Sequence, residues 1–461
     1  MSILGAFTFP HPPLIVPAVG RGRESQIAQT AASCGQAARQ IADLGPDVIV
    51  IASPHSVMYR DYFHISPGRR ASGSLASFGG GDATFEVDYD QELALRIQTL
   101  AEEIGLSAGT LGQRDASLDH GTMVPLWFIG KELENVPIVR IGLSGMSLDD
   151  HYRLGQIIAR AANDLGRHAV FVASGDLSHK LKEDGPYGFD PAGVEYDRRI
   201  MDVFARGALG EILEFEPGLL EQAAECGHRS FAIMAGTLDG MAVKSRVYSH
   251  EDVTGVGYGI ASFVPEEPDG SRRFLDARNS FELERLAALR NAADDYVKLA
   301  IATIEHYVKN GSQPPMPKEL PRDLLDVRAG AFVSIHKRGD LRGCIGTIAP
   351  VADCLAREIM DNAVSAAARD PRFDPITPDE LKWLEINVDV LSAAEDISSE
   401  AELDVKKYGV IVSAGGRRGL LLPDLEGVDT VRQQVEIARR KAGIPPGQKV
   451  KLQRFQVVRH R

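Results

Sequence analysis

The chain has 461 residues, of which 44% are hydrophobic and 25% are charged, and its formal net charge is −13. This length exceeds what one ordinary hydrophobic core covers, so we expect a globular protein of two or three domains. The acidic balance offers no electrostatic footprint for nucleic acid, and the absence of any run of about 18 apolar residues excludes a membrane-spanning helix.

The first part of the chain, residues 1–265, alternates strand-like apolar runs with helical stretches. The predicted strands are 2–9, 47–53, 63–66, 137–142, 168–174 and 257–264. The predicted helices are 25–43, 90–104, 150–165, 192–206 and 228–239. Because alternating strands and helices form βαβ units, we expect an α/β domain with a mixed, mostly parallel sheet flanked by helices.

A polar segment, 266–280, is predicted to link this domain to a second one over 281–461. The second domain begins with an apolar stripe at helical spacing over 281–308 and continues through a proline-rich loop. Predicted strands follow at 330–336, 385–391, 409–413, 418–422 and about 450–458, with a helix at 430–442. This mixture predicts an α+β fold.

The four cysteines and the first residues bear on where the protein works. Cys34, Cys226, Cys344 and Cys354 form no CxxC pair, so free thiols are expected rather than a disulfide framework. No basic segment followed by a long apolar stretch opens the sequence, which argues against a secretory signal. We therefore expect a cytoplasmic protein with no membrane and no nucleic-acid partner.

Four histidines of the first domain stand in turn-like contexts. His11, His55 and His179 each follow a strand-like run, and His120 lies in a Leu-Asp-His-Gly string. Residues just past the carboxyl ends of strands collect in one crevice of an open α/β sheet. Two histidines and one carboxylate are the ligand set of non-haem Fe(II), which predicts His11, His55 and Glu225 as ligands. His179 would then be the acid–base residue and His120 a hydrogen-bond donor to substrate or bound oxygen.

Each of these residues also has an ordinary structural interpretation. A histidine after a strand is commonly a hydrogen-bonding residue, and proline beside His11 and His55 suits a turn. Cys226 adjoins Glu225, so a thiolate ligand with another metal preference stays open, whether it replaces or joins the carboxylate. Arg229 could bind a substrate carboxylate or pair with a structural one.

Four short strings carry a specific family resemblance over about 1–265. They are Phe9-Pro10-His11-Pro12-Pro13, Ser53-Pro54-His55, Gly175-Asp176-Leu177-Ser178-His179 and Glu225-Cys226-Gly227. They resemble the class III extradiol dioxygenases of the LigB type and the related Memo proteins. The dioxygenase resemblance implies Fe(II) held by His11, His55 and Glu225, with His179 as acid–base, cleavage of catechols or aminophenols, and a tendency to form homo-oligomers. In the Memo branch a cysteine stands near the third ligand position.

The second domain contains the string Leu341-Arg342-Gly343-Cys344-Ile345-Gly346-Thr347. Glycines around Cys344 permit backbone conformations closed to other residues, and Arg342 near the thiol would lower its pKa. Cys344 is thus a candidate reactive thiol, although a buried, inert thiol is equally ordinary for a free cysteine.

This string and three others resemble the AMME-region family, also called AmmeMemoRadiSam system protein A, over about 281–461. The others are Glu385-Ile386-Asn387-Val388-Asp389-Val390-Leu391-Ser392, Lys407-Tyr408-Gly409-Val410 and Arg418-Gly419-Leu420-Leu421-Leu422-Pro423. The family name records association with a Memo-like protein and a radical S-adenosylmethionine enzyme, which implies such an enzyme as a partner. The chain lacks a CxxxCxxC cluster and is not itself the radical enzyme.

The sequence thus predicts a non-haem Fe(II) oxidoreductase that acts on a small aromatic diol or aminophenol within an AmmeMemoRadiSam-type system. Two alternatives stay open: a metal-binding scaffold for a radical enzyme, and metal-assisted hydrolysis in the same crevice with His179 as base. The sequence does not fix the substrate, the physiological oxidant or the oligomeric state.

Overall fold

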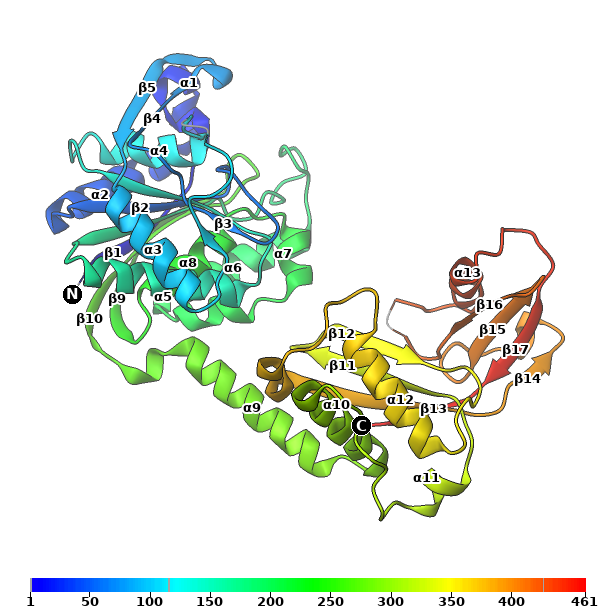
Figure 1. The fold of residues 1–461 in the computed structure, drawn as a ribbon. Helices are drawn as coiled ribbons and strands as arrows, with labels where there is room; N and C mark the ends of the chain where they lie inside the picture. Colours follow the sequence, from blue (N-terminus) through cyan, green and yellow to red (C-terminus); the bar gives the residue numbers. More distant parts are fainter. Residues whose placement is uncertain (1, 115–116, 426) are drawn as a thin grey trace. The chain divides into compact units, whose positions relative to one another are not determined.

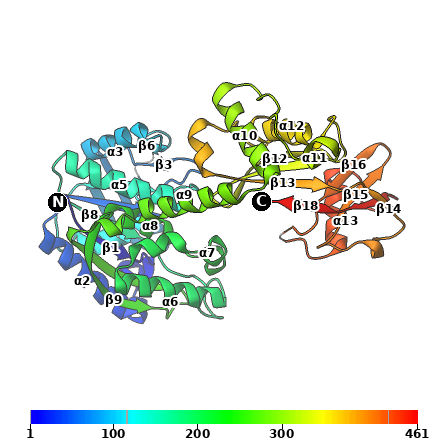
Figure 2. The same cartoon turned by 90° about the horizontal axis from the view of Figure 1, so that it is seen from below.

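The computed structural model describes residues 2–114, 117–425 and 427–461. The chain divides into two compact units, unit 1 up to Ala277 and unit 2 from Arg278 onward (Figures 1 and 2). Within the described ranges, every helix is too short or too polar to cross a bilayer.

Unit 1 is built on a six-stranded sheet with the order β7-β2-β8-β1-β10-β9. Its strands are β1 (Ile3–Phe9), β2 (Val48–Ser53), β7 (Ile138–Gly142), β8 (Ala169–Ser174), β9 (Met241–Glu251) and β10 (Tyr258–Pro268). The first four strands of this order pair in parallel, and β10 and β9 add antiparallel pairs. The predicted mixed, mostly parallel sheet is therefore confirmed.

Helices cover both faces of this sheet, and alternate residues of each strand enter one of two cores. Val48, Val50 and Ala52 of β2 join one core, whereas Ile49 and Ile51 join the other. The first core includes buried residues of α3 (Gln91–Glu103), α5 (Leu148–Asp164), α6 (Pro191–Arg206) and α8 (His228–Thr237). The second includes those of α2 (Ala28–Leu44) and α4 (His120–Ile129). Burial on both faces explains why these strands are continuous apolar runs.

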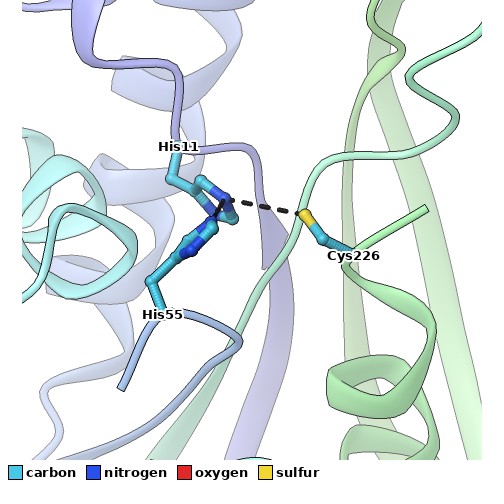
Figure 3. Close-up of side chains that lie close together, drawn as sticks. All are labelled: His11, His55 and Cys226. Carbon is cyan, nitrogen blue, oxygen red and sulfur yellow. Dashed lines mark hydrogen bonds between the residues drawn. The ribbon is translucent and has the colours of Figure 1, made fainter. Parts of the chain in front are cut away.

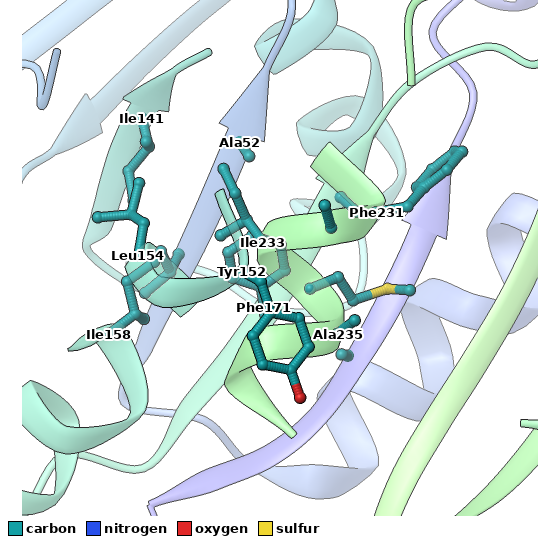
Figure 4. Close-up of a cluster of buried hydrophobic side chains, with 14 of the residues drawn as sticks. Ala52, Ile141, Tyr152, Leu154, Ile158, Phe171, Phe231, Ile233 and Ala235 are labelled. Carbon is teal, nitrogen blue, oxygen red and sulfur yellow. The ribbon is translucent and has the colours of Figure 1, made fainter. Parts of the chain in front are cut away.

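Two glycines allow direct backbone contact between α5 and α8, which both contribute buried residues to the first core. A Cβ at Gly155 would lie 2.0 Å from the carbonyl oxygen of Ile233, and one at Gly236 would lie 1.9 Å from that of Tyr152. Figure 4 shows Tyr152 and Ile233 among the buried side chains around this crossing. Since α8 begins directly after the Glu225-Cys226-Gly227 segment, this crossing also fixes where that segment lies.

Several elements of unit 1 are absent from the sequence expectations. The hairpin β4 (Arg70–Leu75) and β5 (Gly80–Asp88) is largely polar, and β9 carries mostly half-exposed residues, so neither gives a clear apolar run. Helix α4 starts at His120 because the Asp119 side chain caps it by accepting from the Thr122 amide. The other unexpected short elements are α1 (Pro17–Gly20), β6 (Ala108–Gly109) and α7 (Pro217–Ala223), whereas β3 (Phe63–His64) falls within the predicted strand 63–66.

Unit 2 is an α+β structure with two antiparallel sheets, ordered β12-β11-β13-β18 and β14-β17-β15-β16. The strands are β11 (Ala331–Lys337), β12 (Asp340–Gly346), β13 (Leu384–Leu391), β14 (Glu395–Ile397), β15 (Gly409–Ala414), β16 (Arg417–Leu421), β17 (Lys451–Phe455) and β18 (Val457–His460). The helices are α10 (Asp295–Asn310), α11 (Arg322–Asp326), α12 (Leu355–Ala368) and α13 (Val431–Lys441). The predicted fold class is confirmed.

The junction between the units differs from the expected polar linker. Segment 266–280 contains the end of β10, a short 3-10 helix (Gly270–Arg272) and the first residues of α9 (Phe274–Ala292). The apolar stripe over 281–308 also belongs to two helices, because the Asp294 side chain accepts from the amides of Tyr296 and Val297 and starts α10. A helix stripe continues across such a break, so periodicity alone does not reveal it.

The glycine-rich string of unit 2 forms β12 and packs against α12. A Cβ at Gly343 would lie 2.3 Å from the carbonyl oxygen of Ala366, so glycine here permits close approach of strand and helix. Gly343 does not have a positive φ, and the expected unusual backbone conformation is therefore wrong for this residue. Arg342 makes a bidentate pair with Glu380, with both nitrogen–oxygen distances 3.0 Å.

Gly155→Ala should destabilise unit 1 by about 1–3 kcal/mol, because the new methyl overlaps a backbone carbonyl that cannot move freely. The control is Gly35→Ala in α2, where the added Cβ meets nothing closer than a flexible arginine tip at 3.9 Å. At Gly35 the better helix propensity of alanine should raise the free energy of unfolding by about 0.5–1 kcal/mol. Urea unfolding of the two variants measures both changes, and equal behaviour would contradict the close packing of α5 on α8.

The Glu380 pair should make unit 2 sensitive to acid. Burial alone would raise the pKa of Glu380, but hydrogen bonds from Arg342, the Thr377 amide and Lys337 lower it from 4.5 to about 2. The depressed pKa means that the stabilisation is present above about pH 4.5 and is lost as pH falls towards 2. In hydrogen–deuterium exchange, β12 peptides should therefore open more readily in Glu380→Gln than in wild type at pH 7. This difference should shrink across that acidic window, and a constant difference would contradict the assignment.

Candidate functional site

The carboxyl ends of three adjacent parallel strands define the candidate site of unit 1. Strand β8 lies between β2 and β1 in the sheet. His55 follows β2 by two residues, His11 follows β1 by two residues, and Asp176 follows β8 by two residues. Figure 3 shows His11, His55 and Cys226 pointing towards one another. The expected gathering of the histidines at one sheet edge is thus what the fold produces.

The two histidine rings approach each other through their Nε2 atoms. His11 Nε2 lies 3.0 Å from His55 Nε2 and 3.7 Å from the Sγ of Cys226. His120, the first residue of α4, adds a third ring, with its centroid 4.0 Å from that of His55 and 5.4 Å from that of His11. Three imidazoles and one thiol therefore share one small volume.

The hydrogen bonds of His11 determine which of its nitrogens is free. Its Nδ1 lies 2.9 Å from the hydroxyl of Ser174, and that hydroxyl donates to the carbonyl oxygen of Gly121 at 2.5 Å. Because the hydroxyl hydrogen is used in the second bond, the Ser174 oxygen accepts from Nδ1–H of His11. The Nε2 lone pair is then available, and it faces His55 and Cys226, as a metal-binding imidazole requires.

The site keeps its histidines neutral. Burial, with the neighbouring His55, lowers the pKa of His11 to about 3. Burial and the other two rings likewise lower the pKa of His120 to about 3. Burial also lowers the pKa of His55, although Asp119 and Asp176 oppose the shift. Neutral imidazoles are the form that binds metal ions.

Glu225 and Cys226 take different directions after α7. A Glu225 carboxylate oxygen accepts from the backbone amide of His228 at 2.6 Å, at the start of α8. Burial raises the pKa of Glu225 to about 7, against that hydrogen bond and the charge of Arg229. Among the described residues, the groups with metal-binding geometry contain Cys226 and not Glu225. In the structure the thiol of Cys226 lies beside His11 and His55, whereas the carboxylate of Glu225 accepts from the first amide of α8, so the metal ligand role of Glu225 stays a prediction.

A contact between two glycines brings Cys226 to the site. A Cβ at Gly175 would lie 2.1 Å from the Cα of Gly227, so the loops after β8 and α7 touch backbone to backbone. As a result the Asp176 amide donates to the Cys226 Sγ at 3.3 Å. Gly175 belongs to the string Gly-Asp-Leu-Ser-His and Gly227 to the string Glu-Cys-Gly. No pattern in the sequence predicts that these two strings lie in contact.

Asp176 and His179 form a second donor group with Cys226, in which the ligand atoms all lie within 4.8 Å of one another. Asp176 accepts from the His11 amide at 2.8 Å, and burial raises the pKa of this carboxyl to about 6. The Nε2 of His179 is buried and has no hydrogen-bond partner among the described residues. Burial lowers the pKa of His179, and Asp176 opposes the shift. Sequence reasoning singled out His179 but missed Asp176 in the same string.

A carboxylate behind the cluster supports the His55 loop. Asp119 accepts from the Ser53 hydroxyl at 2.5 Å and lies 3.5 Å from Arg140. The same Ser53 hydroxyl oxygen accepts from the His55 amide at 3.2 Å. Asp119 thereby joins the start of α4 to the end of β2, which keeps His120 and His55 together.

The other predicted site residues, Arg229 and Cys344, have contacts of their own. Arg229 is on α8, and its charge lowers the pKa of Glu225, so its contact with a substrate carboxylate stays a prediction. In unit 2, the Sγ of Cys344 lies 3.2 Å from the Ser334 hydroxyl, and its amide donates to Asp370 at 2.9 Å. Arg372 pairs with Asp370 and donates to the Cys344 carbonyl at 3.0 Å. Arg342 is engaged by Glu380, so the expected arginine beside the thiol is not found there.

Comparison with known proteins matches each unit to a different family. Residues 5–261 match the catalytic LigB subunit of aromatic ring-opening dioxygenase, and residues 297–460 match AMMECR1. The chain is 40% identical over its full length to protein CA_C1420 of Clostridium acetobutylicum, which is covered completely. It is 54% identical over 168 residues to a protein of Thermotoga maritima, across 36% of this chain and 97% of the relative.

Two solved structures are also similar. PH0010 of Pyrococcus horikoshii is 30% identical with a TM-score of 0.34, covering 36% of this chain and 88% of that one. JW3007 of Escherichia coli K12 is 14% identical with a TM-score of 0.38, covering 56% and 99%. The family matches span both units, and the LigB match alone exceeds half of the chain. The chain therefore belongs to the LigB family of aromatic ring-opening dioxygenase subunits and carries an AMMECR1 domain after it.

Proposed function

We propose that unit 1 is a metal-dependent oxidoreductase that opens an aromatic diol or aminophenol ring in the extradiol manner, with Fe(II) as its metal. The observation that carries the proposal is the convergence of two neutral imidazoles and a thiol, His11, His55 and Cys226, in a LigB-family fold. These three residues would hold the ion. When bound, the ion would supply a Lewis acid with open positions for the two oxygens of a diol.

The donor chemistry of the residues fits a transition metal. The Nε2 of His11 carries its lone pair towards the cluster because Ser174 fixes the tautomer. The ring of His55 packs against His11 and His120, but part of its side chain is exposed to solvent, so a small molecule can reach one side of the cluster. The Asp176 carboxylate lies 3.9 Å from His11 Nε2 and adds negative charge that favours a cation.

His179 has the properties of the acid–base residue. Its lowered pKa keeps the imidazole neutral near pH 7, so it can accept a proton from a substrate hydroxyl. Its Nε2 is buried and has no partner among the described residues, so no other hydrogen bond competes for that atom. Asp176, in the same donor group, stabilises the imidazolium that this transfer forms.

Unit 2 supports a role within a larger system. The AMMECR1 match follows the LigB match in the same chain, and fusion of two domains argues that they act together. We propose a radical S-adenosylmethionine enzyme as the partner of this fused protein, on the resemblance to the AmmeMemoRadiSam family.

Cys226 favours a second candidate function. A thiolate in place of the usual carboxylate shifts a site towards softer ions such as Zn²⁺ or Cu(I). With such an ion the protein would be a metal-binding partner protein that cleaves no ring. The two candidates share the ligands and differ in oxygen consumption.

His55→Ala and Cys226→Ser should each lose stoichiometric metal after anaerobic Fe(II) loading, because each removes one of three ligands. Glu225→Gln should retain it, since a glutamine oxygen still caps α8. His168→Ala, at a side chain 61% exposed, is the matched control for loss of an imidazole. Metal content by mass spectrometry decides the outcome. Loss of metal in Glu225→Gln with retention in Cys226→Ser would restore the carboxylate as the ligand.

His179→Ala should keep the metal but lose about 10²- to 10⁴-fold in turnover, the usual contribution of a positioned acid–base group. The measurement is oxygen uptake on addition of a catechol to the iron-loaded protein, with wild type alongside. Iron binding without oxygen uptake in wild type would favour the metal-binding partner role instead.

A further inference from the structure

Two aromatic side chains that remain largely exposed contact the histidines of the site. The Tyr187 side chain is 60% exposed, and its ring stacks on His179 with centroids 5.0 Å apart and an interplanar angle of 28°. Phe78 is 43% exposed, and its ring meets His120 with centroids 5.1 Å apart at 60°. Single exposed aromatic residues are ordinary, but here Tyr187 lies beside His179 of one donor group and Phe78 lies beside His120, which packs on His55 of the other.

Tyr187 is held by a loop whose ends are fixed. Leu181 and Phe189 form a β-bridge, and the Asp190 amide donates to the Lys180 carbonyl at 3.0 Å. The loop also rests on Gly255, where an added Cβ would lie 2.7 Å from the Cα of Gly185. The backbone therefore holds Tyr187 beside His179 while most of its side chain stays exposed.

Phe78 lies in the turn of the β4–β5 hairpin. It ends a short 3-10 helix (Ala76–Phe78), and Gly79 follows with φ of 85°, a conformation that favours glycine. Arg21 donates to the Gly79 carbonyl at 2.8 Å and ties this turn to the body of unit 1. The hairpin, which carries no ligand of the cluster, thus brings an aromatic ring to it.

We propose that Tyr187 and Phe78 are the aromatic walls that bind the ring of the substrate and select planar aromatic ligands over aliphatic ones. The proposal rests on the proposed function, whose substrate class it deepens. Ligands of a metal ion recognise only the chelating oxygens, so they do not distinguish a catechol from any other bidentate chelator. Offset or edge-to-face contact with an aromatic ring supplies that distinction.

The test compares two chelators on the anaerobic, iron-loaded full-length protein by calorimetry. 4-Nitrocatechol has an aromatic ring, whereas acetohydroxamate is bidentate but has none. Tyr187→Ala and Phe78→Ala should each weaken 4-nitrocatechol binding about three- to tenfold, the range that one aromatic contact provides. Acetohydroxamate binding and metal content should not change.

Two further variants control for other effects. Tyr187→Phe keeps the ring and should bind 4-nitrocatechol as wild type does. Phe281→Ala removes an aromatic side chain that is 70% exposed in unit 2, and it should change neither affinity.

The possible outcomes distinguish failure of the aromatic contacts from failure of the proposed ring-opening function. If Tyr187→Ala and Phe78→Ala leave the affinity for 4-nitrocatechol unchanged, or lower the affinity for both chelators equally, the proposed role of the two aromatic side chains is wrong. The proposed metal site is not affected by that result. If wild type binds metal but neither chelator, the proposed function fails and this inference fails with it.

Discussion

The parallel pairing of β8 with both β1 and β2 is the constraint on which the candidate site depends. It places the segments that follow these strands at one sheet edge, and the Ser174–His11 hydrogen bond then fixes the tautomer of the first histidine. With Nδ1 occupied, the only free nitrogen of His11 faces His55 and Cys226. Burial in unit 1 keeps the imidazoles of His11 and His120 neutral, which is the form of imidazole that binds metal ions.

Much of this arrangement could be predicted from the sequence, because both faces of the central strands are buried and the strands read as continuous apolar runs. The same logic placed His11, His55 and His179 at strand ends. The position of Cys226 beside the histidines could not be predicted, since it depends on the backbone contact between Gly175 and Gly227. Asp176 was missed for a related reason: its role depends on the His11 amide, 165 residues away in the chain.

In unit 2, residues of the specific string 341–347 are engaged in packing and hydrogen bonding. Gly343 lets β12 approach α12, Arg342 pairs with Glu380, and Cys344 is tied to Asp370 through its backbone. The expected special backbone and activated thiol do not follow from these contacts. Gly343 and Arg342 are thus used in packing and pairing, and the reactivity of Cys344 stays a prediction.

X-ray absorption at the iron edge of the loaded protein tests the central claim most directly, because it counts sulfur among the ligands. With Cys226 as a ligand, we expect one sulfur scatterer at about 2.3 Å together with imidazole nitrogens, and loss of the sulfur in Cys226→Ser. A spectrum with nitrogen and oxygen scatterers alone would contradict it, and would return the third ligand position to a carboxylate.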